Sequence, residues 1–392
     1  MREEKMKKQH IKLSRIVRYR LPMALLLSMT MIVGCGASAD DGQTSSAEQA
    51  EAEVGDQTGG DVNAATDEGT GTDATADAGA DNGSDVADGT ETNDVPSVIN
   101  AEEDGFMLPE TTMLTSELLN LKYQFAKEDF GVKWTSPDES IVKVGPKGSL
   151  IKAMRVGHVT LEGISSDGKH RFQCDITVEK KPKNIIYLTF DDGPSRYSTP
   201  KILDILKKNA IHATFFELKP AKADYDLTQR VIDEGHTLAI HGYQHKYDQI
   251  YKSDLAYHKN LVKLQRLFYR QFGQWCTQTR FPGGSSNTIS RHYSVGIMSR
   301  LVKKVHRWGF LYQDWNVSSG DAGGSNTPDE VFRMVTSGIQ KGRSNVVLMH
   351  DFSGNDKTIN ALQRIIDWGK QHNFVFRGMS PSTVEIHHGV NN

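Results

Sequence analysis

The sequence predicts an α/β protein in which a small all-β domain precedes a parallel-sheet domain. Segments after residue 183 alternate between strand and helix patterns, and repeated strand–helix units predict a parallel sheet that closes, or nearly closes, into a barrel. Short alternating segments over residues 96–181 favour a β-sandwich. A nearly continuous apolar run over residues 185–190 is typical of a strand buried on both faces.

Residues 1–35 have the pattern of an export signal. Basic residues up to Arg20 precede an apolar core over residues 21–33, which is too short for a comfortable transmembrane helix. The core ends in Ile-Val-Gly followed by Cys35, which resembles a bacterial lipoprotein lipobox. The resemblance implies a lipid on Cys35 and a location on the outer face of the cell membrane. The alternative is a simple signal anchor.

Residues 36–95 are acidic and almost free of large apolar side chains. They contain 16 Asp and Glu residues and no Lys or Arg. Such a segment buries too little apolar surface to fold, and its like charges keep it extended. We therefore expect a disordered linker, with a binding tail as the alternative.

Residues 96–181 predict the β-sandwich domain. Its strand candidates are residues 133–136, 141–144, 159–161 and 172–178. Trp134, Gly148 and Gly157, with the residues beside them, resemble a bacterial immunoglobulin-like domain of group 2. The resemblance implies a spacer or a glycan-contacting module.

Residues 182–392 form the predicted parallel-sheet domain. Later strand signals cover residues 213–216, 237–240, 310–314, 345–349 and 374–376. Helix signals follow a Thr199-Pro200 cap and cover residues 226–234, 253–273, 327–338 and 357–368. Loops at the carboxyl ends of these strands are expected to carry the chemistry.

The first strand of this domain leads into two adjacent carboxylates, Asp191 and Asp192, and a Gly-Pro turn. Acids at the carboxyl end of a buried parallel strand lie where α/β folds bind ligands. Two neighbouring aspartates repel each other, so the pair makes sense if a cation binds one and leaves the other free to accept a proton. The alternative is an acidic turn without function.

Two histidines, His241 and His245, follow another predicted strand. A four-residue spacing can place both imidazoles on one side of a turn, within reach of one ion. The spacing alone proves little in a chain with 14 His. Its position after a strand, together with the Asp pair, indicates a metal site.

Five motifs in order resemble the polysaccharide deacetylases of carbohydrate esterase family 4, also called the NodB-homology domain. They are residues 189–194, residues 241–245, residues 280–284, Asp314-Trp315 with Asp321, and residues 348–351. The resemblance covers roughly residues 183–379. It implies a distorted (β/α) barrel, in agreement with the strand–helix pattern.

The resemblance implies that Asp192, His241 and His245 hold a divalent metal ion. Two His and one carboxylate leave open positions for water and substrate, and Zn²⁺ is the expected ion, with Co²⁺ or Ni²⁺ as alternatives. Family members usually carry Ser or Thr where this chain has Gly242. The replacement removes a possible hydrogen bond and bears on metal affinity rather than on ligation.

The resemblance also implies catalytic roles. Asp191 is the expected general base and Arg280 its partner, while the backbone N–H of Gly283 is expected to stabilise the oxyanion. His350 is the expected general acid for the departing amine, with Asp321 raising its pKa.

Substrate contacts are expected at two further positions. Leu348 would line an acetyl pocket, and Trp315 would belong to the groove wall or to the scaffold.

The leading function is metal-dependent removal of N-acetyl groups from GlcNAc-type polysaccharide, with cell-wall peptidoglycan as the expected polymer. One alternative is an O-acetyl esterase acting on xylan or a similar polymer. Another is a non-catalytic cell-surface glycan-binding lipoprotein. No Lys/Arg cluster indicates nucleic-acid binding, and the sequence leaves the oligomeric state open.

Overall fold

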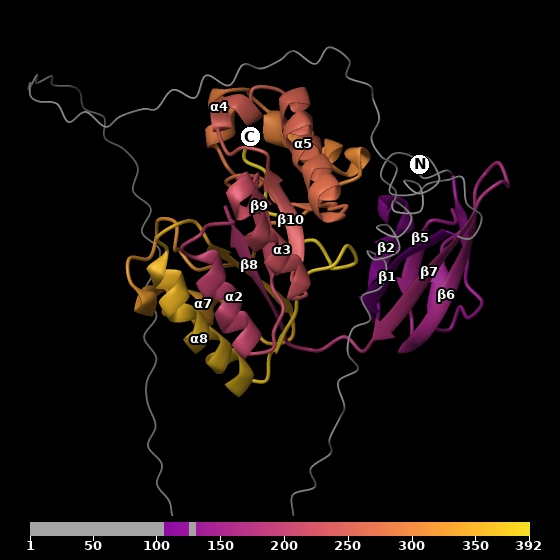
Figure 1. Cartoon of the computed structure of the whole chain (residues 1–392), viewed down its shortest axis with the longest axis horizontal. Helices are drawn as coiled ribbons and strands as arrows, with labels where there is room; N and C mark the ends of the chain where they lie inside the picture. Colours follow the sequence, from indigo (N-terminus) through magenta and orange to yellow (C-terminus); the bar gives the residue numbers. More distant parts are fainter. Residues whose placement is uncertain (1–105, 125–130) are drawn as a thin grey trace, which may run out of the picture. The chain divides into compact units, whose positions relative to one another are not determined.

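The computed structural model describes residues 106–124 and 131–392 of the chain (Figure 1). The predicted signal at residues 1–35 and the predicted linker at residues 36–95 lie outside the described residues, as does the start of the predicted β-sandwich domain. None of the helices in the described ranges has the length and apolar character that a membrane crossing requires.

The first described residues form two β-sheets. One sheet has the order β1-β7-β6-β3, and its strands are β1 (Phe106–Leu114), β3 (Lys133–Thr135), β6 (Gly157–Ile164) and β7 (Arg171–Glu179). The other has the order β2-β5-β4, and its strands are β2 (Leu118–Asn120), β4 (Val142–Val144) and β5 (Leu150–Ala153). A short 3₁₀ helix, η1 (Leu121–Gln124), follows β2.

Both of these sheets contribute to one apolar core. Every second residue of β7 is buried, so that Phe172 and Cys174 face inward, where Phe172 packs against Trp134. Ile151 of β5 joins the same core from the second sheet. A shared core between two sheets is the expected organisation of a sandwich. The more specific assignment to the group 2 immunoglobulin-like family stays a prediction.

The larger sheet contains eight parallel strands, and the predicted α/β class is confirmed. Seven strands follow the order β12-β11-β10-β9-β8-β14-β13, and β15 pairs with the start of β8. The strands are β8 (Ile185–Asp191), β9 (Thr214–Leu218), β10 (Thr237–Gly242), β11 (Gln278–Thr279), β12 (Leu311–Tyr312), β13 (Val317–Ser318), β14 (Ser344–His350) and β15 (Val375–Phe376). The sheet is a curled half-barrel with edges at β12 and β13. All seven residues of β8 are buried, as the apolar run predicted.

Helices cover this sheet. They are α2 (Thr199–Lys208), α3 (Tyr225–Asp233), α4 (Tyr247–Ile250), α5 (Asp254–Phe272), α6 (Ile297–Lys304), α7 (Pro328–Gly338) and α8 (Asp356–Gln371), with 3₁₀ helices η2 (Lys222–Asp224), η3 (Ile289–His292) and η4 (His306–Trp308). Figure 1 shows α2, α7 and α8 side by side, and their apolar residues pack with Leu188 of β8 in one core. A second core joins α5 and α6 to β10.

Local sequence signals explain several helix ends. The Ser253 side chain accepts a hydrogen bond from the Ala256 N–H at the start of α5, and Gly273 ends that helix at φ 70°. A reciprocal capping box formed by Thr327 and Glu330 begins α7. These helices therefore begin and end close to the predicted positions.

The predicted cap of α2 is wrong. Thr199 is the first residue of the helix, and the N-cap position is occupied by Ser198, which makes no side-chain cap. The Thr199 hydroxyl instead donates to an Asp351 carboxylate oxygen at 2.6 Å and accepts from the Ser195 N–H at 2.8 Å. The local sequence pattern assigned the Thr199 hydroxyl to the start of the helix. In the structure it bonds instead to Asp351, which is distant in sequence.

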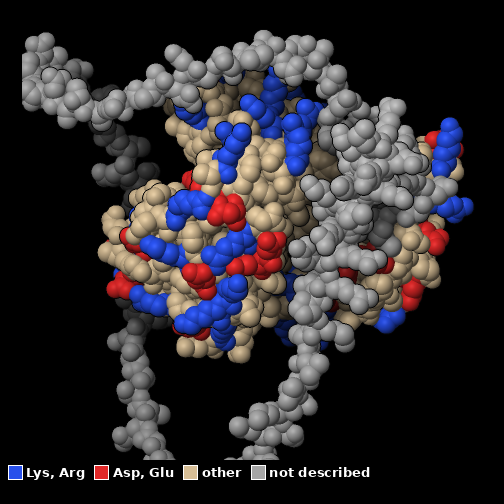
Figure 2. All heavy atoms as spheres, in the orientation of Figure 1, with Lys and Arg blue, Asp and Glu red and all other residues tan. Residues whose placement is uncertain are grey.

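Charged side chains are distributed unevenly over the face shown in Figure 2. Asp and Glu accompany Lys and Arg over the lower helices, whereas Lys and Arg predominate near α5. Several of the mixed charges are paired, for example Arg230 with Asp204 and with Glu234.

Candidate active site

Parallel pairing brings the predicted site residues to one edge of the large sheet. The register places His350 at the end of β14 opposite Asp191 at the end of β8. His241 lies at the end of β10, and Arg280 directly follows β11. Since carboxyl ends of parallel strands meet at the same edge, residues more than 150 positions apart become neighbours.

Asp191 and Arg280 form a buried ion pair. The Arg280 side chain is fully buried, and its Nη1 donates to Asp191 Oδ1 at 2.7 Å and to Thr189 Oγ1 at 2.8 Å. Its Nε and Nη2 donate to the carbonyl oxygens of Gln313 and Asp314. Burial raises the pKa of Asp191, and the Arg280 charge opposes that rise. The Arg280 guanidinium is thus fixed by several hydrogen bonds, and it orients the Asp191 carboxylate in turn.

Asp192 turns away from this ion pair toward two imidazoles. Its backbone adopts φ 75°, a left-handed conformation that Asp tolerates better than most residues. Its Oδ1 lies 3.4 Å from His241 Nε2 and 3.8 Å from His245 Nε2. One ligand atom from each of the three residues lies within 4.8 Å of the others. The three predicted metal ligands are therefore brought together.

The donor set fits a divalent metal ion. Asp192 Oδ1 is buried without a hydrogen-bond partner among the described residues, which is costly for a carboxylate unless a cation compensates. His241 Nδ1 lies 3.1 Å from the Arg280 carbonyl oxygen, which leaves its Nε2 free. Burial lowers the pKa of His241 to about 3, so the ring is neutral at physiological pH, as a metal ligand must be.

His350 and Asp321 form the second predicted pair. His350 Nδ1 lies 2.7 Å from Asp321 Oδ1, and the His350 N–H donates to Asp321 Oδ2 at 2.8 Å. Asn355 and Thr358 also donate to Asp321, which is 1% exposed. Burial acts to lower the pKa of His350, but the hydrogen bond and charge of Asp321 outweigh it and raise the pKa to about 9. The imidazole is therefore protonated at neutral pH, with Nε2 as its second donor.

The loop that contains Gly283 is shaped by close contacts. Gly283 adopts φ 77°, and the Pro282 carbonyl before it accepts a hydrogen bond from the Tyr251 hydroxyl at 2.8 Å. None of the hydrogen bonds found among residues 106–124 and 131–392 uses the Gly283 N–H. A Cβ at Gly284 would lie 2.8 Å from the Trp315 ring, so this glycine permits the ring to pack against the loop.

Leu348 and Trp315, the two predicted substrate contacts, have different surroundings. Leu348 is 8% exposed and lies in β14 next to Thr189 of β8. The Trp315 carbonyl accepts a hydrogen bond from His388 Nε2 at 2.6 Å, and the two rings lie 4.6 Å apart. Trp315 is thus anchored in the scaffold on one side, while a substrate contact at either residue stays a prediction.

Gly242 has a steric reason to be glycine. It adopts φ 147°, and a Cβ at this position would lie 2.5 Å from Asn260 Nδ2. Asn260 holds the loop between the two histidines, because its side chain accepts from the Gln244 N–H and donates to the Gln244 carbonyl oxygen. The Ser or Thr expected from the family resemblance would clash here, and Asn260 supports the loop instead.

The sequence interpretation assigned no role to Asp351, which is fully buried behind the site. Burial raises its pKa to about 7, and one of its oxygens has no partner among the described residues. A Cβ at Gly193 would clash with this carboxyl group, which explains the glycine after the Asp pair. The only feature of the sequence that could have pointed to Asp351 was its position next to His350.

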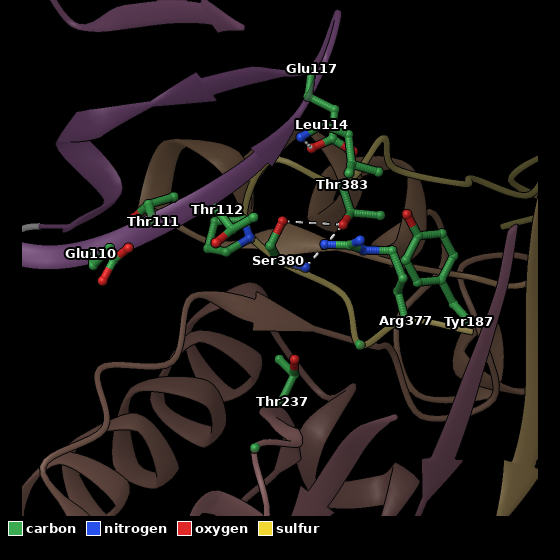
Figure 3. Close-up of a pocket in the computed structure, with 13 residues that line it drawn as sticks. Glu110, Thr111, Thr112, Leu114, Glu117, Tyr187, Thr237, Arg377, Ser380 and Thr383 are labelled. Atoms are coloured by element: carbon green, nitrogen blue, oxygen red, sulfur yellow. Dashed lines mark hydrogen bonds between the residues drawn. The ribbon is translucent and has the colours of Figure 1, made fainter. Parts of the chain in front are cut away.

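A cavity of about 420 Å³ lies elsewhere, at residues of β1 and of the segment 377–383 (Figure 3). Arg377, Ser380 and Thr383 line it together with Tyr187. None of its lining residues belongs to the group formed around Asp191 and His350. The chemistry of the side chains, rather than the size of a cavity, therefore locates the candidate active site.

Comparisons with known proteins identify relatives of the part of the chain that contains this site. Residues 178–296 match the family model for polysaccharide deacetylase. The solved catalytic domain of a peptidoglycan N-acetylglucosamine deacetylase from Eubacterium rectale is 42% identical, with a TM-score of 0.51, and the match covers 54% of this chain and 96% of that domain.

Two relatives extend the comparison. A peptidoglycan-N-acetylglucosamine deacetylase of Bacillus cereus is 29% identical over 202 residues, which are 50% of this chain and 69% of the relative. An uncharacterised 30.6 kDa protein of Geobacillus stearothermophilus is 30% identical over 210 residues, which are 52% of this chain and 72% of that protein. With the parallel half-barrel and the five motifs at its carboxyl edge, the chain belongs to the polysaccharide deacetylase family.

Proposed function

We propose that this protein is a metal-dependent deacetylase that removes N-acetyl groups from the GlcNAc residues of cell-wall peptidoglycan. The observation that carries the proposal is the position of the Asp191 carboxylate. It lies beside the candidate metal ligand His241 and, in the sheet register, opposite the protonated His350. A base, a metal site and an acid at the carboxyl edge of one sheet are the parts that hydrolysis of an amide requires. The names of the Eubacterium rectale and Bacillus cereus relatives support the choice of polymer.

Asp192, His241 and His245 are the residues that would hold the metal ion. A divalent ion there supplies Lewis-acid chemistry, which polarises an amide carbonyl and makes water more acidic. Two histidines and one carboxylate suit Zn²⁺, and Co²⁺ or Ni²⁺ also accept this donor set.

Asp191 is proposed to accept the proton of the attacking water. Its Oδ1 is occupied by Arg280, so Oδ2 is the free oxygen, and this atom lies 4.0 Å from His241 Nε2, on the metal side of the site. As water adds to the acetyl carbon, negative charge develops on the carbonyl oxygen. The free N–H of Gly283 is the proposed donor to that oxygen.

His350 is proposed to protonate the leaving amine. Its Nδ1 is held by Asp321, which directs Nε2 to the substrate. When the carbon–nitrogen bond breaks, the proton of Nε2 goes to the glucosamine nitrogen, and acetate is the second product. A partner that raises the pKa of the imidazole keeps the acid protonated for this step.

The test is treatment of purified cell-wall peptidoglycan with the protein, with and without a chelator, followed by mass spectrometry of wall digests. We expect muropeptides that lack one acetyl group per modified GlcNAc, and we expect the chelator to prevent their formation. The Asp191→Asn variant controls for contaminating deacetylases. Unmodified muropeptides together with acetate release from acetylxylan would contradict the proposal and identify an O-acetyl esterase instead.

A further inference from the structure

A second group of metal-binding side chains lies outside the active site. His306 belongs to η4, whereas Glu385 and His387 belong to the segment that follows the last strand, nearly 80 residues later in the chain. One ligand atom from each residue lies within 4.8 Å of the other two. His306 Nε2 lies 3.0 Å and His387 Nε2 lies 3.2 Å from Glu385 Oε2.

We propose that His306, Glu385 and His387 bind a second divalent metal ion, with Zn²⁺ as the ion that suits their donor set. Zinc binds His nitrogen and carboxylate oxygen at about 2.0–2.2 Å in tetrahedral geometry, which places neighbouring ligand atoms about 3.4 Å apart. The two nitrogen–oxygen separations here are within a few tenths of an ångström of that value. In the active-site set the corresponding separations are 3.4 and 3.8 Å.

The three side chains are held in place by other contacts. The His387 ring stacks on Tyr312, with centroids 3.9 Å apart and an interplanar angle of 9°. The Tyr312 N–H donates to Glu385 Oε2 at 2.9 Å. The His306 ring also packs against the Tyr312 ring, with centroids 5.5 Å apart. The ligands would therefore lose little conformational freedom on binding an ion.

The cluster is accessible to an ion and to water. The His306, Glu385 and His387 side chains are 34%, 21% and 36% exposed. Three protein ligands and a water molecule complete a tetrahedral zinc coordination. The competing arrangement is an ion-pair cluster in which protonated imidazoles donate to Glu385, and His387 Nε2 also lies 3.2 Å from the Tyr312 carbonyl oxygen.

An ion at this position would fasten the C-terminal segment to the edge strand β12. The same segment continues along that edge, where the Asp314 N–H donates to the Ile386 carbonyl oxygen and the His388 N–H donates to Asp314 Oδ2. The carbonyl groups of Gln313 and Asp314 in turn accept from Arg280. An ion at this site would therefore tie the C-terminal segment to the chain just after β12, where the carbonyl groups of Gln313 and Asp314 hold the Arg280 side chain.

The experiment counts zinc in full-length protein whose active-site ligands have been removed. His241→Ala combined with His245→Ala leaves the second cluster intact, and its zinc content is measured by elemental analysis after dialysis against buffered micromolar zinc. We expect two ions per chain in the unaltered protein and one in the double variant. Addition of His387→Gln should reduce the count to zero, whereas His372→Gln, the matched control outside the cluster, should leave it at one.

Two further readouts keep the test independent of catalysis and of folding defects. Zinc should raise the thermal unfolding temperature of the double variant and have no effect once His387→Gln is added. Co²⁺ bound to the double variant should show the visible absorption of a tetrahedral site. A double variant that binds no zinc and shows no thermal shift overturns the proposal and identifies the ion-pair cluster. That outcome leaves the proposed deacetylase activity untouched, because activity is assayed on the unaltered protein.

Discussion

Asp191 and Asp192 are adjacent in sequence yet have different surroundings. Asp191 ends a buried strand and pairs with Arg280, whereas the left-handed backbone of Asp192 directs its carboxylate to the two imidazoles. The sequence suggested this division, because two adjacent carboxylates are best explained by one cation and one base. The proposed roles differ accordingly, so substitutions at the two kinds of position should have different effects.

The first prediction separates the proton acceptor from the metal ligands. Asp191→Asn removes the base but no ligand, so kcat should fall by about 10²–10⁴-fold while the metal content stays unchanged. His241→Ala removes a ligand and should lower both activity and the metal content of the active site. Elemental analysis and initial rates on the same preparations test this. Equal metal loss in the two variants would show that Asp191 is itself a ligand.

The second prediction concerns the acid. Burial acts to lower the pKa of His350, but Asp321, aided by the charges of Asp191 and Asp192, raises this pKa to about 9, and a general acid acts in its protonated form. Asp321→Asn removes the charge that raises this pKa, so the imidazole should lose its proton at lower pH and the alkaline limb of the kcat profile should move to lower pH. The profile is measured at saturating substrate, with Thr358→Val as a variant that disturbs Asp321 but keeps its charge. An alkaline limb that does not move would exclude Asp321 as the partner that sets this pKa.

Longer elements were easier to predict than short ones. The apolar run of β8 and the capped helices α5 and α7 carry their signals in consecutive residues, and the structure confirms them. β11 and β13 contain two residues each, too few for a periodic pattern, and β12 is shorter than the predicted strand at residues 310–314. Beyond Tyr312 the Gln313 N–H still donates to the Thr279 carbonyl oxygen of β11, but Asp314 bonds to Ser285 and to the C-terminal segment.

The candidate site was predictable only in part, because most of its contacts join residues that are distant in sequence. The ligand set and the His350–Asp321 pair could be named through the family resemblance, since no local pattern links residues 29 positions apart. The roles of Asn260 and Asp351 depend on contacts between distant segments. The sequence showed that this chain has Gly242 where the resembled family usually has Ser or Thr. It did not show the cause, which is the position of Asn260.

The third prediction concerns the loop after β10. Gly242→Ala should destabilise the protein by about 1–3 kcal/mol, because a Cβ would meet Asn260 and the backbone conformation is unfavourable for other residues. Gly309→Ala is the matched control, since Gly309 also has a positive φ but no heavy atom near its Cβ position. Denaturant unfolding should show the larger loss for Gly242→Ala. Similar losses in both variants would mean that backbone strain alone, without the Asn260 contact, accounts for the effect.

At the scale of the whole molecule, the predicted signal and linker would decide where the enzyme works. They lie outside the described residues, so the lipid on Cys35 and the linker at residues 36–95 stay predictions. About 60 residues could span about 200 Å when fully extended, at about 3.4 Å per residue. As a flexible coil the ends would lie about 45 Å apart on average, and like charges should increase this distance. Such a linker would let a membrane-anchored deacetylase reach into the surrounding wall.

The fourth prediction tests this arrangement in the native host. Cys35→Ala should release activity from the membrane fraction, and deletion of residues 36–95 should lower wall deacetylation without lowering activity on soluble oligomers. Detergent phase separation and mass spectrometry of wall digests are the measurements. A deleted form that modifies the wall as fully as the intact protein would rule out a role for linker length, and a Cys35 variant that stays in the detergent phase would rule out the lipid.

The covered edge of β12 also bears on how the protein behaves in concentrated solution. An edge strand with free N–H and C=O groups is a template on which another molecule can add a strand. The C-terminal segment bonds to the backbone of Tyr312 and Asp314 and so occupies this template. A chain shortened before Val384 would uncover it and favour self-association through added strands. An affinity tag is therefore better placed where it does not pull this segment from the sheet.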